Sequence, residues 1–181
     1  RTSISRKIAG KQTEEQVIVA NIDVVFIVQG LDNDFNMRRL ERYLLLVKEN
    51  GAEPIIVLNK TDIAENIDDK VNLVTSISGN IPVVPISAKT NSGLDELKSK
   101  ITFGKTFAFV GSSGVGKSTI INSLMGKELL KTQEVRTDDS RGRHTTTQRE
   151  MIIFPDGGIL VDTPGMREIQ LWSSEDRLEN T

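Results

Sequence analysis

The sequence predicts one α/β domain built on a six-stranded, mostly parallel, doubly wound sheet. Three observations indicate this class: apolar runs of strand length alternate with helical stripes, a glycine-rich loop joins one such run to a helix, and further polar motifs follow other runs. The 181 residues suit one well-buried domain and are few for two. The 23 basic and 25 acidic residues nearly cancel, so the composition gives no bulk attraction to nucleic acid.

The N-terminal segment, residues 1–16, is polar and basic without a clear period, and we interpret it as a linker or tail preceding a domain of residues 17–181. An apolar run at residues 23–28 then predicts a strand covered on both faces. Apolar residues next recur at spacings of three and four, which predicts a helix that ends near Gly51. This stripe consists of Met37, Leu40, Leu44 and Val47.

The remaining elements alternate in the same way. Strands are expected at residues 55–58, 82–86 and 106–110, and helical segments within 63–77, around 94–101 and at 117–125. Residues 126–147 show no period, which is typical of a functional or mobile loop. Two last runs, 151–154 and 159–161, flank a Pro-Asp-Gly-Gly turn and predict a β-hairpin whose outer strand is the antiparallel edge of the sheet.

A complete phosphate-loop motif, G-x-x-x-x-G-K-S, lies between the strand at 106–110 and the following helix. Its glycines let backbone N–H groups surround phosphates, and the helix N-terminus adds positive potential. We expect Lys117 to reach the β- and γ-phosphates as a binding and catalytic group, and Ser118 to bind Mg²⁺. The predicted phosphate-binding residues are Gly111, Ser112, Ser113, Gly114, Val115, Gly116, Lys117, Ser118 and Thr119.

A carboxylate for the metal is predicted at Asp162, which ends the strand at 159–161 and begins Asp-Thr-Pro-Gly. In P-loop NTPases a strand-end Asp of this kind holds Mg²⁺ through a water molecule, and the N–H of the following Gly165 can reach the γ-phosphate. The pattern D-x-x-G is weak by itself, and a second copy begins at Asp139. No strand precedes that copy, so we prefer Asp162.

A base-recognition motif, Asn59-Lys60-Thr61-Asp62, follows the strand at 55–58. A carboxylate at Asp62 can accept from both N1–H and the exocyclic amino group of guanine, a donor pair that adenine lacks. We expect Lys60 to lay its aliphatic stem along the base and Asn59 to tie this loop to the phosphate loop.

A second base motif, Ser87-Ala88-Lys89, follows the strand at 82–86. A backbone N–H here could donate to the base oxygen, and Lys89 could cover the other face of the base. The tripeptide is weak evidence alone, because a surface turn would explain it equally well. Its value is that every motif follows a predicted strand, at the edge where α/β sheets bind ligands.

The motifs come in an unusual order, because Ras-like proteins place the phosphate loop before N-K-x-D. Here the base motif comes first, and only 16 residues follow Gly165, which leaves no room for another base site. Either the base motif is coincidental or the chain is circularly permuted, with residues 98–105 bridging the old termini. We favour a circularly permuted P-loop GTPase fold.

These motifs together resemble the ribosome small-subunit-dependent GTPases, the family known as RsgA, YjeQ or YloQ. The resemblance rests on the permuted order, the phosphate loop Gly-x-Ser-Gly-Val-Gly-Lys-Ser-Thr and several further runs. These runs are Asn33-Asp34-Phe35-Asn36, Arg38-Arg39-Leu40-Glu41-Arg42-Tyr43-Leu44, Gly142-Arg143-His144-Thr145-Thr146-Thr147 and Asp162-Thr163-Pro164-Gly165-Met166-Arg167-Glu168.

The resemblance implies a bacterial, cytoplasmic factor that acts late in maturation of the 30S subunit, with hydrolysis of GTP to GDP stimulated by that subunit. The partners it implies are the small ribosomal subunit and rRNA, bound through a longer protein. Residues 1–16 would then follow an N-terminal OB-fold, and zinc would belong only to a C-terminal domain absent from this sequence. We expect a monomer without a membrane segment, since no apolar run approaches a membrane span.

The loop at 126–147 carries the candidates for catalysis. Spacing and analogy favour Thr146 as the switch threonine that closes on Mg²⁺ and the γ-phosphate, although an ordinary Thr-rich turn is the alternative. Met166 stands where Ras-like enzymes have a water-orienting Gln. His144 resembles the position credited with that role in the family, and the alternative is a surface or RNA-contacting histidine.

Competing interpretations of the function remain at this stage. The first is a GTP-hydrolysing ribosome-assembly enzyme, and the second is a nucleotide-gated binding module with negligible turnover, which Met166 favours. A permuted GTPase of large-subunit assembly is a weaker alternative, because the Gly-Arg-His-Thr-Thr-Thr run argues against it. An ATPase is least favoured because of Asp62.

Overall fold

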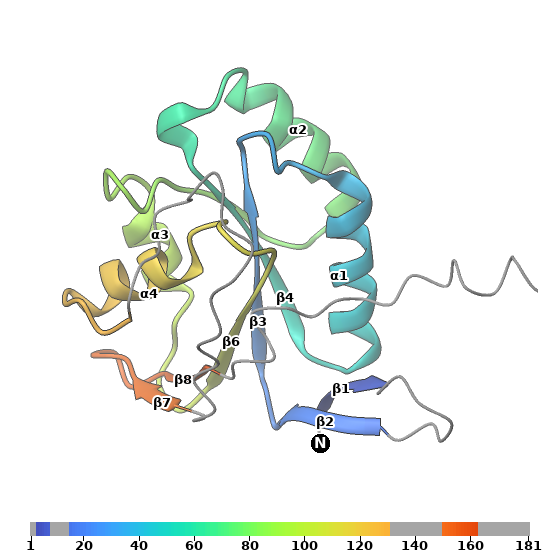
Figure 1. Cartoon of the computed structure of the whole chain (residues 1–181), viewed down its shortest axis with the longest axis vertical. Coiled ribbons are helices and arrows are strands. Elements are labelled where there is room, and N and C mark those ends of the chain that lie inside the picture. The colour runs from blue at the N-terminus through green and yellow to red at the C-terminus, as the bar shows by residue number, and fades with distance from the viewer. Residues whose placement is uncertain (1–2, 8–14, 131–149, 163–181) are drawn as a thin grey trace, which may run out of the picture.

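The computed structural model of the chain describes residues 3–7, 15–130 and 150–162, and in these residues it confirms the predicted class (Figure 1). One sheet has the strand order β5-β4-β3-β6-β8-β7, in which β7 pairs antiparallel with β8 and the other pairs are parallel. The elements are β1 (Ser3–Lys7), β2 (Glu15–Ala20), β3 (Val24–Gly30), α1 (Met37–Glu49), β4 (Glu53–Asn59), η1 (Thr61–Ile63), α2 (Ile67–Ser78), β5 (Val83–Pro85), α3 (Leu94–Ser99), β6 (Thr106–Val110), α4 (Lys117–Met125), β7 (Glu150–Ile153) and β8 (Ile159–Asp162).

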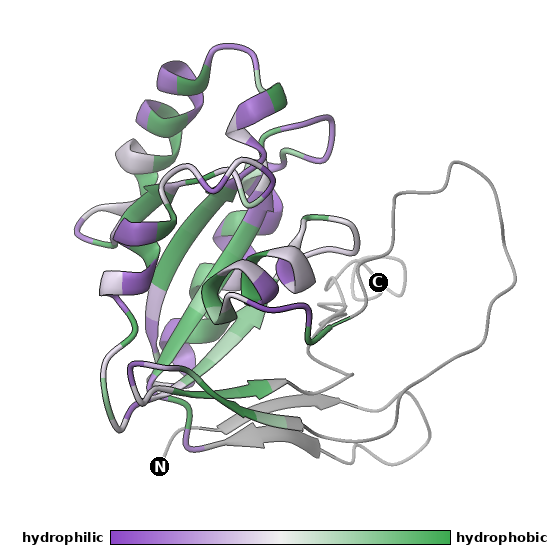
Figure 2. Cartoon of the chain, turned by 90° about the vertical axis from the view of Figure 1, so that its left-hand side faces the viewer, coloured by the Kyte–Doolittle hydropathy of each residue, from purple (hydrophilic) through white to green (hydrophobic). Residues whose placement is uncertain are grey.

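Strand β3 lies at the centre of the fold and is buried along its whole length. Val24, Phe26 and Val28 point into a core shared with α3 and α4, whereas Val25 and Ile27 point into a core shared with α1 and α2. These helix pairs cover opposite faces of the sheet (Figure 1), and Figure 2 shows apolar strands between helices with hydrophilic outer faces. A strand covered on both faces requires a near-continuous apolar run, which is the pattern seen in the sequence.

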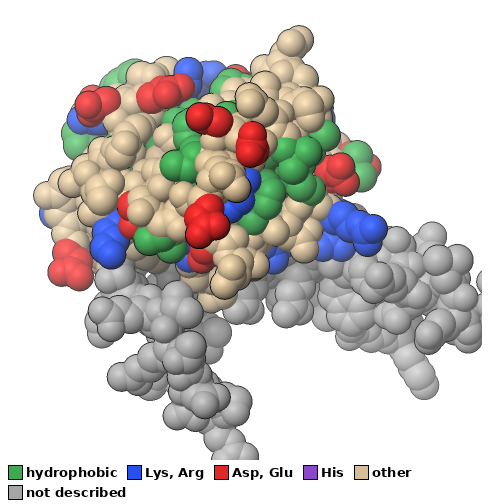
Figure 3. Space-filling model, turned by 90° about the horizontal axis from the view of Figure 1, so that it is seen from above, with side chains coloured by type: hydrophobic (Ala, Val, Ile, Leu, Met, Phe, Trp, Pro, Cys, Tyr) green, Lys and Arg blue, Asp and Glu red, His purple; other side chains and the backbone are tan. Residues whose placement is uncertain are grey.

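The parallel strands bring all the motif loops to one edge of the sheet. The loops after β3, β4, β5 and β6 all leave from the carboxyl ends of these strands, which is where doubly wound sheets bind ligands. Figure 3 shows the molecule from this side, where acidic and basic side chains are interspersed rather than separated by sign. The sheet topology thus makes neighbours of motifs that lie far apart in the sequence.

Part of the predicted linker is paired in the structure. Strands β1 and β2 form an antiparallel pair with a register shift between Ile4 and Ser5. The ladder relies on backbone hydrogen bonds, which polar residues form as readily as apolar ones, so the weak apolar pattern of residues 3–7 gives no sign of it. The interpretation of residues 1–16 as a tail that follows another domain stays a prediction.

Other boundaries agree closely with the sequence. The predicted strand at 106–110 and helix at 117–125 coincide with β6 and α4, and the predicted hairpin is formed by β7 and β8. The bridge proposed at residues 98–105 runs from the end of α3 to β6. None of the helices in the described part of the chain combines the length and apolar character needed to cross a membrane.

Candidate nucleotide-binding site

The phosphate loop occupies residues 111–116, between β6 and α4. Gly116 has a φ of +96°, and a Cβ there would lie 2.3 Å from the side-chain nitrogen of Asn59. A Cβ on Gly111 would lie 2.3 Å from the carbonyl oxygen of Val28. Both positions therefore require glycine, through backbone conformation or through the close approach of neighbouring strands.

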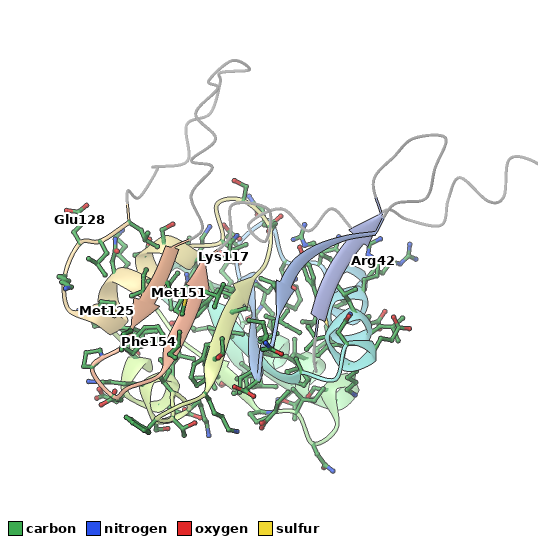
Figure 4. The ribbon with its side chains drawn as sticks, turned by 90° about the horizontal axis from the view of Figure 1, so that it is seen from below. Arg42, Lys117, Met125, Glu128, Met151 and Phe154 are labelled. Carbon is green, nitrogen blue, oxygen red and sulfur yellow. The ribbon has the colours of Figure 1, made fainter. Side chains whose placement is uncertain are left out.

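The side chain of Lys117 is held against this loop by backbone carbonyl groups of the loop. Its Nζ donates to the carbonyl oxygens of Gly111 at 2.8 Å and of Ser112 at 2.7 Å. Lys117 and Met125, the two ends of α4, are labelled in Figure 4. Ser118 and Thr119 follow in the first turn of α4, where backbone N–H groups have no carbonyl partner within the helix. The arrangement gathers an ammonium and helix N–H donors at one end of β6.

Asn59 joins three loops at the carboxyl edge of the sheet. The residue is 3% exposed, and its Nδ2 donates to the carbonyl oxygen of Val115 in the phosphate loop at 2.8 Å. Its Oδ1 accepts from the backbone N–H of Ala88 at 3.1 Å. This is the link between base loop and phosphate loop that the sequence predicts, with the Ser-Ala-Lys loop as a third partner.

The two base loops are also bonded directly to each other. The hydroxyl of Ser87 donates to Asp62 Oδ1 at 2.7 Å, and the backbone N–H of Thr61 donates to the carbonyl oxygen of Ile86 at 3.2 Å. Lys60 takes a left-handed conformation with a φ of +71°, which turns the chain into the short helix η1 that carries Asp62. The exposed Asp62 carboxylate is therefore held in place by a buried serine.

One backbone N–H of the Ser-Ala-Lys loop already has a partner in the protein. The N–H of Ala88 donates to Asn59 in this structure. Lys89 is exposed, as a residue that covers a ligand would be. Donation from this loop to a base stays a prediction, and it requires either Lys89 N–H or an exchange of partners at Ala88.

Sequence reasoning missed the loop after β3 as part of this site. Lys60 Nζ donates to Asp32 Oδ2 at 2.6 Å, and the backbone N–H of Asp34 donates to Asp32 Oδ1 at 3.3 Å. Burial raises the pKa of Asp32, but the hydrogen bond and charge of Lys60 together with backbone N–H groups outweigh burial and hold that pKa below its ordinary value. The sequence shows only two aspartates just beyond the carboxyl end of a buried strand, and it does not indicate their partners.

Asp32 makes the stability of the fold depend on pH. Its folded-state pKa lies below the unfolded value, so its stabilisation is present at neutral pH and is lost as pH falls through the folded pKa. We expect Asp32→Asn to lower the free energy of unfolding by about 1 kcal/mol at neutral pH and by progressively less in acid, as the pH falls through the folded pKa. Urea denaturation at neutral and at acid pH measures this.

A matched control for this prediction is Asp156→Asn. Asp156 pairs with Lys98 at 3.9 Å with both side chains about half exposed, so its effect should be smaller than that of Asp32. An equal loss from Asp32→Asn at both pH values would show that the carboxylate charge contributes nothing.

The donors expected for Mg²⁺ are compatible with that ion. Within the described residues no three His, Cys, Asp or Glu side chains gather into a metal cluster. The residues expected to hold the ion are Ser118, Thr146 and Asp162, of which Thr146 lies outside the described residues. Oxygen ligands of this kind suit a hard cation. Strand β8, which ends at Asp162, pairs in parallel with β6, which leads into the phosphate loop. The parallel pairing thus brings the end of β8 and the phosphate loop after β6 to the same edge of the sheet.

Several predicted site residues lie outside the described part of the structure. They are His144, Thr146 and Gly165, together with Met166, and the side chain of Asp162 is also not described. Their assigned roles therefore stay predictions.

Comparisons of sequence place the chain among known proteins. The sequence profile of the RsgA GTPase family matches residues 1–172. A protein of Xanthomonas oryzae pv. oryzae named small ribosomal subunit biogenesis GTPase RsgA is 51% identical over 180 residues, and one of the same name from Methanosarcina acetivorans is 49% identical over 179 residues. Each alignment covers 99% of this chain but 50% and 48% of the relative. The chain thus spans about half the length of the curated relatives it matches.

Solved structures share the fold of this chain. YjeQ from Thermotoga maritima superposes with a TM-score of 0.63 at 31% identity, over 83% of this chain and 49% of that one. YloQ, described as a circularly permuted GTPase, superposes with a TM-score of 0.58 at 24% identity over 87% of this chain and 48% of that one, which shows the fold. The base motif precedes the phosphate loop in the sequence and is bonded to it in the fold. Because the family profile also matches nearly the whole length of the chain, the chain belongs to the RsgA GTPase family.

Proposed function

We propose that this chain binds GTP and GDP with Mg²⁺ and hydrolyses GTP, and that the longer protein uses this cycle in a late step of small-subunit maturation in the cytoplasm. The observation that carries the proposal is Asn59, which bonds the base motif to the phosphate loop and to the Ser-Ala-Lys loop. The names of the relatives support the ribosomal role, and they favour the small subunit over the large one.

The chemistry divides between two ends of the site. At one end, Lys117 and the N–H groups of residues 111–119 would bind the phosphates and stabilise charge that develops on them. Gly165 would add an N–H toward the γ-phosphate. Mg²⁺, held by Ser118, Thr146 and Asp162, would supply further neutralisation of phosphate charge when bound.

At the other end, the residues would select guanine. Asp62, fixed by Ser87, would accept from N1–H and the exocyclic amino group. Lys60 would lay its methylene stem along the base while its ammonium stays on Asp32. Base and phosphates would therefore bind to loops that are already bonded to one another.

The direct test is calorimetric titration of this chain with GDP and with ADP in the presence of Mg²⁺. We expect GDP binding at least about 100-fold tighter than ADP binding, because ADP would leave the Asp62 carboxylate without its donors. Equal affinities would remove the base assignment, and the absence of GDP binding would remove the proposed function.

A second candidate is a nucleotide-gated binding module with negligible turnover. Met166 favours it, because a thioether cannot orient the attacking water as a glutamine does. GTP turnover by the full-length protein, measured with and without small ribosomal subunits, separates the two candidates. Turnover that stays negligible with subunits present would favour the binding module.

The residue proposed to position the water is His144. In the full-length protein we expect His144→Ala to lower subunit-stimulated GTP turnover by about 100-fold, the usual contribution of a positioned acid–base group, with GDP affinity unchanged. Steady-state turnover and GDP titration measure the two quantities. Stimulated turnover equal to that of the wild type would end this assignment.

A further inference from the structure

The phosphate loop has a partner outside the motifs, the short loop of residues 31–36 between β3 and α1. The hydroxyl of Ser112, the second residue of the phosphate loop, donates to Asp34 Oδ2 across 78 positions of sequence. The same oxygen accepts from Arg39 of α1 at 2.7 Å, and the Arg39 guanidinium also donates to the Asp34 carbonyl oxygen. One carboxylate oxygen thus joins a helix to the phosphate loop.

This contact leads directly to the phosphate-binding ammonium. The carbonyl oxygen of Ser112 accepts from Lys117 Nζ, so Ser112 is held by its side chain at Asp34 and by its backbone at Lys117. A continuous series of bonds therefore runs from Arg39 through Asp34 and Ser112 to Lys117. Movement of Ser112 would move one of the two carbonyls that orient the ammonium.

The charges in this series are balanced. A lone carboxylate beside a phosphate loop would repel a nucleotide polyphosphate, because two like charges at close range oppose each other. Arg39 lies on Asp34 with 23% of its side chain exposed, against 37% for Asp34, so solvent screens this pair only in part. Arg39 thereby lets Asp34 serve as an anchor without repelling the ligand.

The loop itself is held from several sides. Lys70 of α2 donates to the Leu31 carbonyl oxygen at 2.7 Å and lies 5.7 Å from the ring centre of Phe35. Asn36 caps α1 by accepting from the backbone N–H of Arg39 at 3.0 Å. An anchor at Asp34 is therefore supported by both helices on this face of the sheet.

We propose that Asp34 is a positioning residue for nucleotide binding: it orients the phosphate loop through Ser112, and Arg39 cancels its charge. This inference rests on the proposed function, because it concerns affinity for GDP. It adds to the site a residue that belongs to no phosphate, base or metal motif of the sequence.

The test is a double-mutant cycle on GDP affinity with Mg²⁺ present. We expect Asp34→Ala and Ser112→Ala each to weaken GDP binding about tenfold, as loss of a charge-assisted hydrogen bond would, and the double variant to be no weaker than either single one. Additive losses, or unchanged affinity in both single variants, would overturn the proposal.

A matched control separates positioning from stability. Asp23 Oδ2 accepts from the backbone N–H of Thr106 at 2.7 Å, so it anchors the same strand, β6, at the end remote from the phosphate loop. We expect Asp23→Ala to lower the thermal midpoint and leave GDP affinity unchanged. If Asp23→Ala weakened GDP binding as much as Asp34→Ala, the effect would be structural and the proposal would fall.

The role of Arg39 has its own readout. Arg39→Gln leaves Asp34 without its counter-charge, so GDP binding should weaken about threefold and the loss should grow at low salt. The Ser112→Ala loss, which involves no charge change, should not depend on salt. A salt-independent Arg39→Gln effect would refute charge cancellation. Failure of the wild-type chain to bind GDP would defeat the proposed function itself, whereas wild-type binding with unaltered variants would defeat only this inference.

Discussion

Replacing Asp62 by asparagine is expected to change the base preference of the chain from guanine to xanthine. A carboxylate accepts two hydrogen bonds from the N1–H and amino group of guanine, whereas an amide presents one acceptor and one donor. Xanthine carries a carbonyl where guanine carries the amino group, so it complements the amide. We expect GDP affinity to fall about 1,000-fold, or about 4 kcal/mol, and XDP affinity to rise correspondingly.

The structure indicates that this variant would retain the fold. Asp62 is exposed, and the Ser87 hydroxyl that donates to its Oδ1 can donate equally to an amide oxygen. Competition titrations of GDP against XDP measure the change. Asp68→Asn, at an exposed position in the first turn of α2, provides the control and should leave both affinities unaltered. Unchanged guanine selectivity in Asp62→Asn would refute the base assignment.

The helix and sheet layers and the phosphate loop could be predicted from the sequence because residue type and local spacing determine them. The run at 106–110, the glycines after it and the helix from 117 each follow from residue type and spacing, and β6 and α4 have these bounds. The buried apolar run of β3 similarly predicted a strand covered on both faces. These elements could be recognised without knowing how the strands pair in the sheet.

The contacts of residues 31–36 could not be predicted from local sequence patterns. Asp32 and Asp34 look like ordinary turn residues, and their partners Lys60 and Ser112 lie 28 and 78 positions away. Only the placement of β3 between β4 and β6 brings this loop between the base motif and the phosphate loop. Strand order is a property of the whole sheet, so a local pattern does not carry it.

The paired strands β1 and β2 were missed for a different reason. A ladder depends on backbone groups, and Ser-Ile-Ser-Arg-Lys offers only one apolar side chain to signal it. The permutation, by contrast, could be inferred because it concerns the order of motifs and not their contacts. The bond between Asn59 and Val115 then shows that the reordered motifs meet.

Replacing Asn59 is expected to have the second large effect, on both folding stability and GDP affinity. Asn59→Ala removes two hydrogen bonds at a site that is 3% exposed, and it leaves the Val115 carbonyl and the Ala88 N–H without a partner. We expect the free energy of unfolding to fall by about 3 kcal/mol and GDP affinity to fall about 100-fold. Chemical denaturation and calorimetric titration with GDP measure the two losses.

A control separates the two losses from a general effect of removing an asparagine. Asn50 also donates its amide to a backbone carbonyl, that of Leu46 at 2.7 Å, but at the end of α1 away from the motifs. Asn50→Ala should cost some stability and leave GDP affinity intact. A similar affinity loss in both variants would assign the effect to weakened folding.

Asn59→Asp separates loss of the bond from loss of the side chain. The aspartate has the same shape and can still accept from Ala88, but it places an oxygen against the Val115 carbonyl oxygen where Asn59 donates at 2.8 Å. Two acceptors cannot bond, so the base loop and phosphate loop should separate and GDP affinity should fall about as far as in Asn59→Ala. Wild-type GDP affinity in Asn59→Asp would mean that the two loops bind nucleotide without this link.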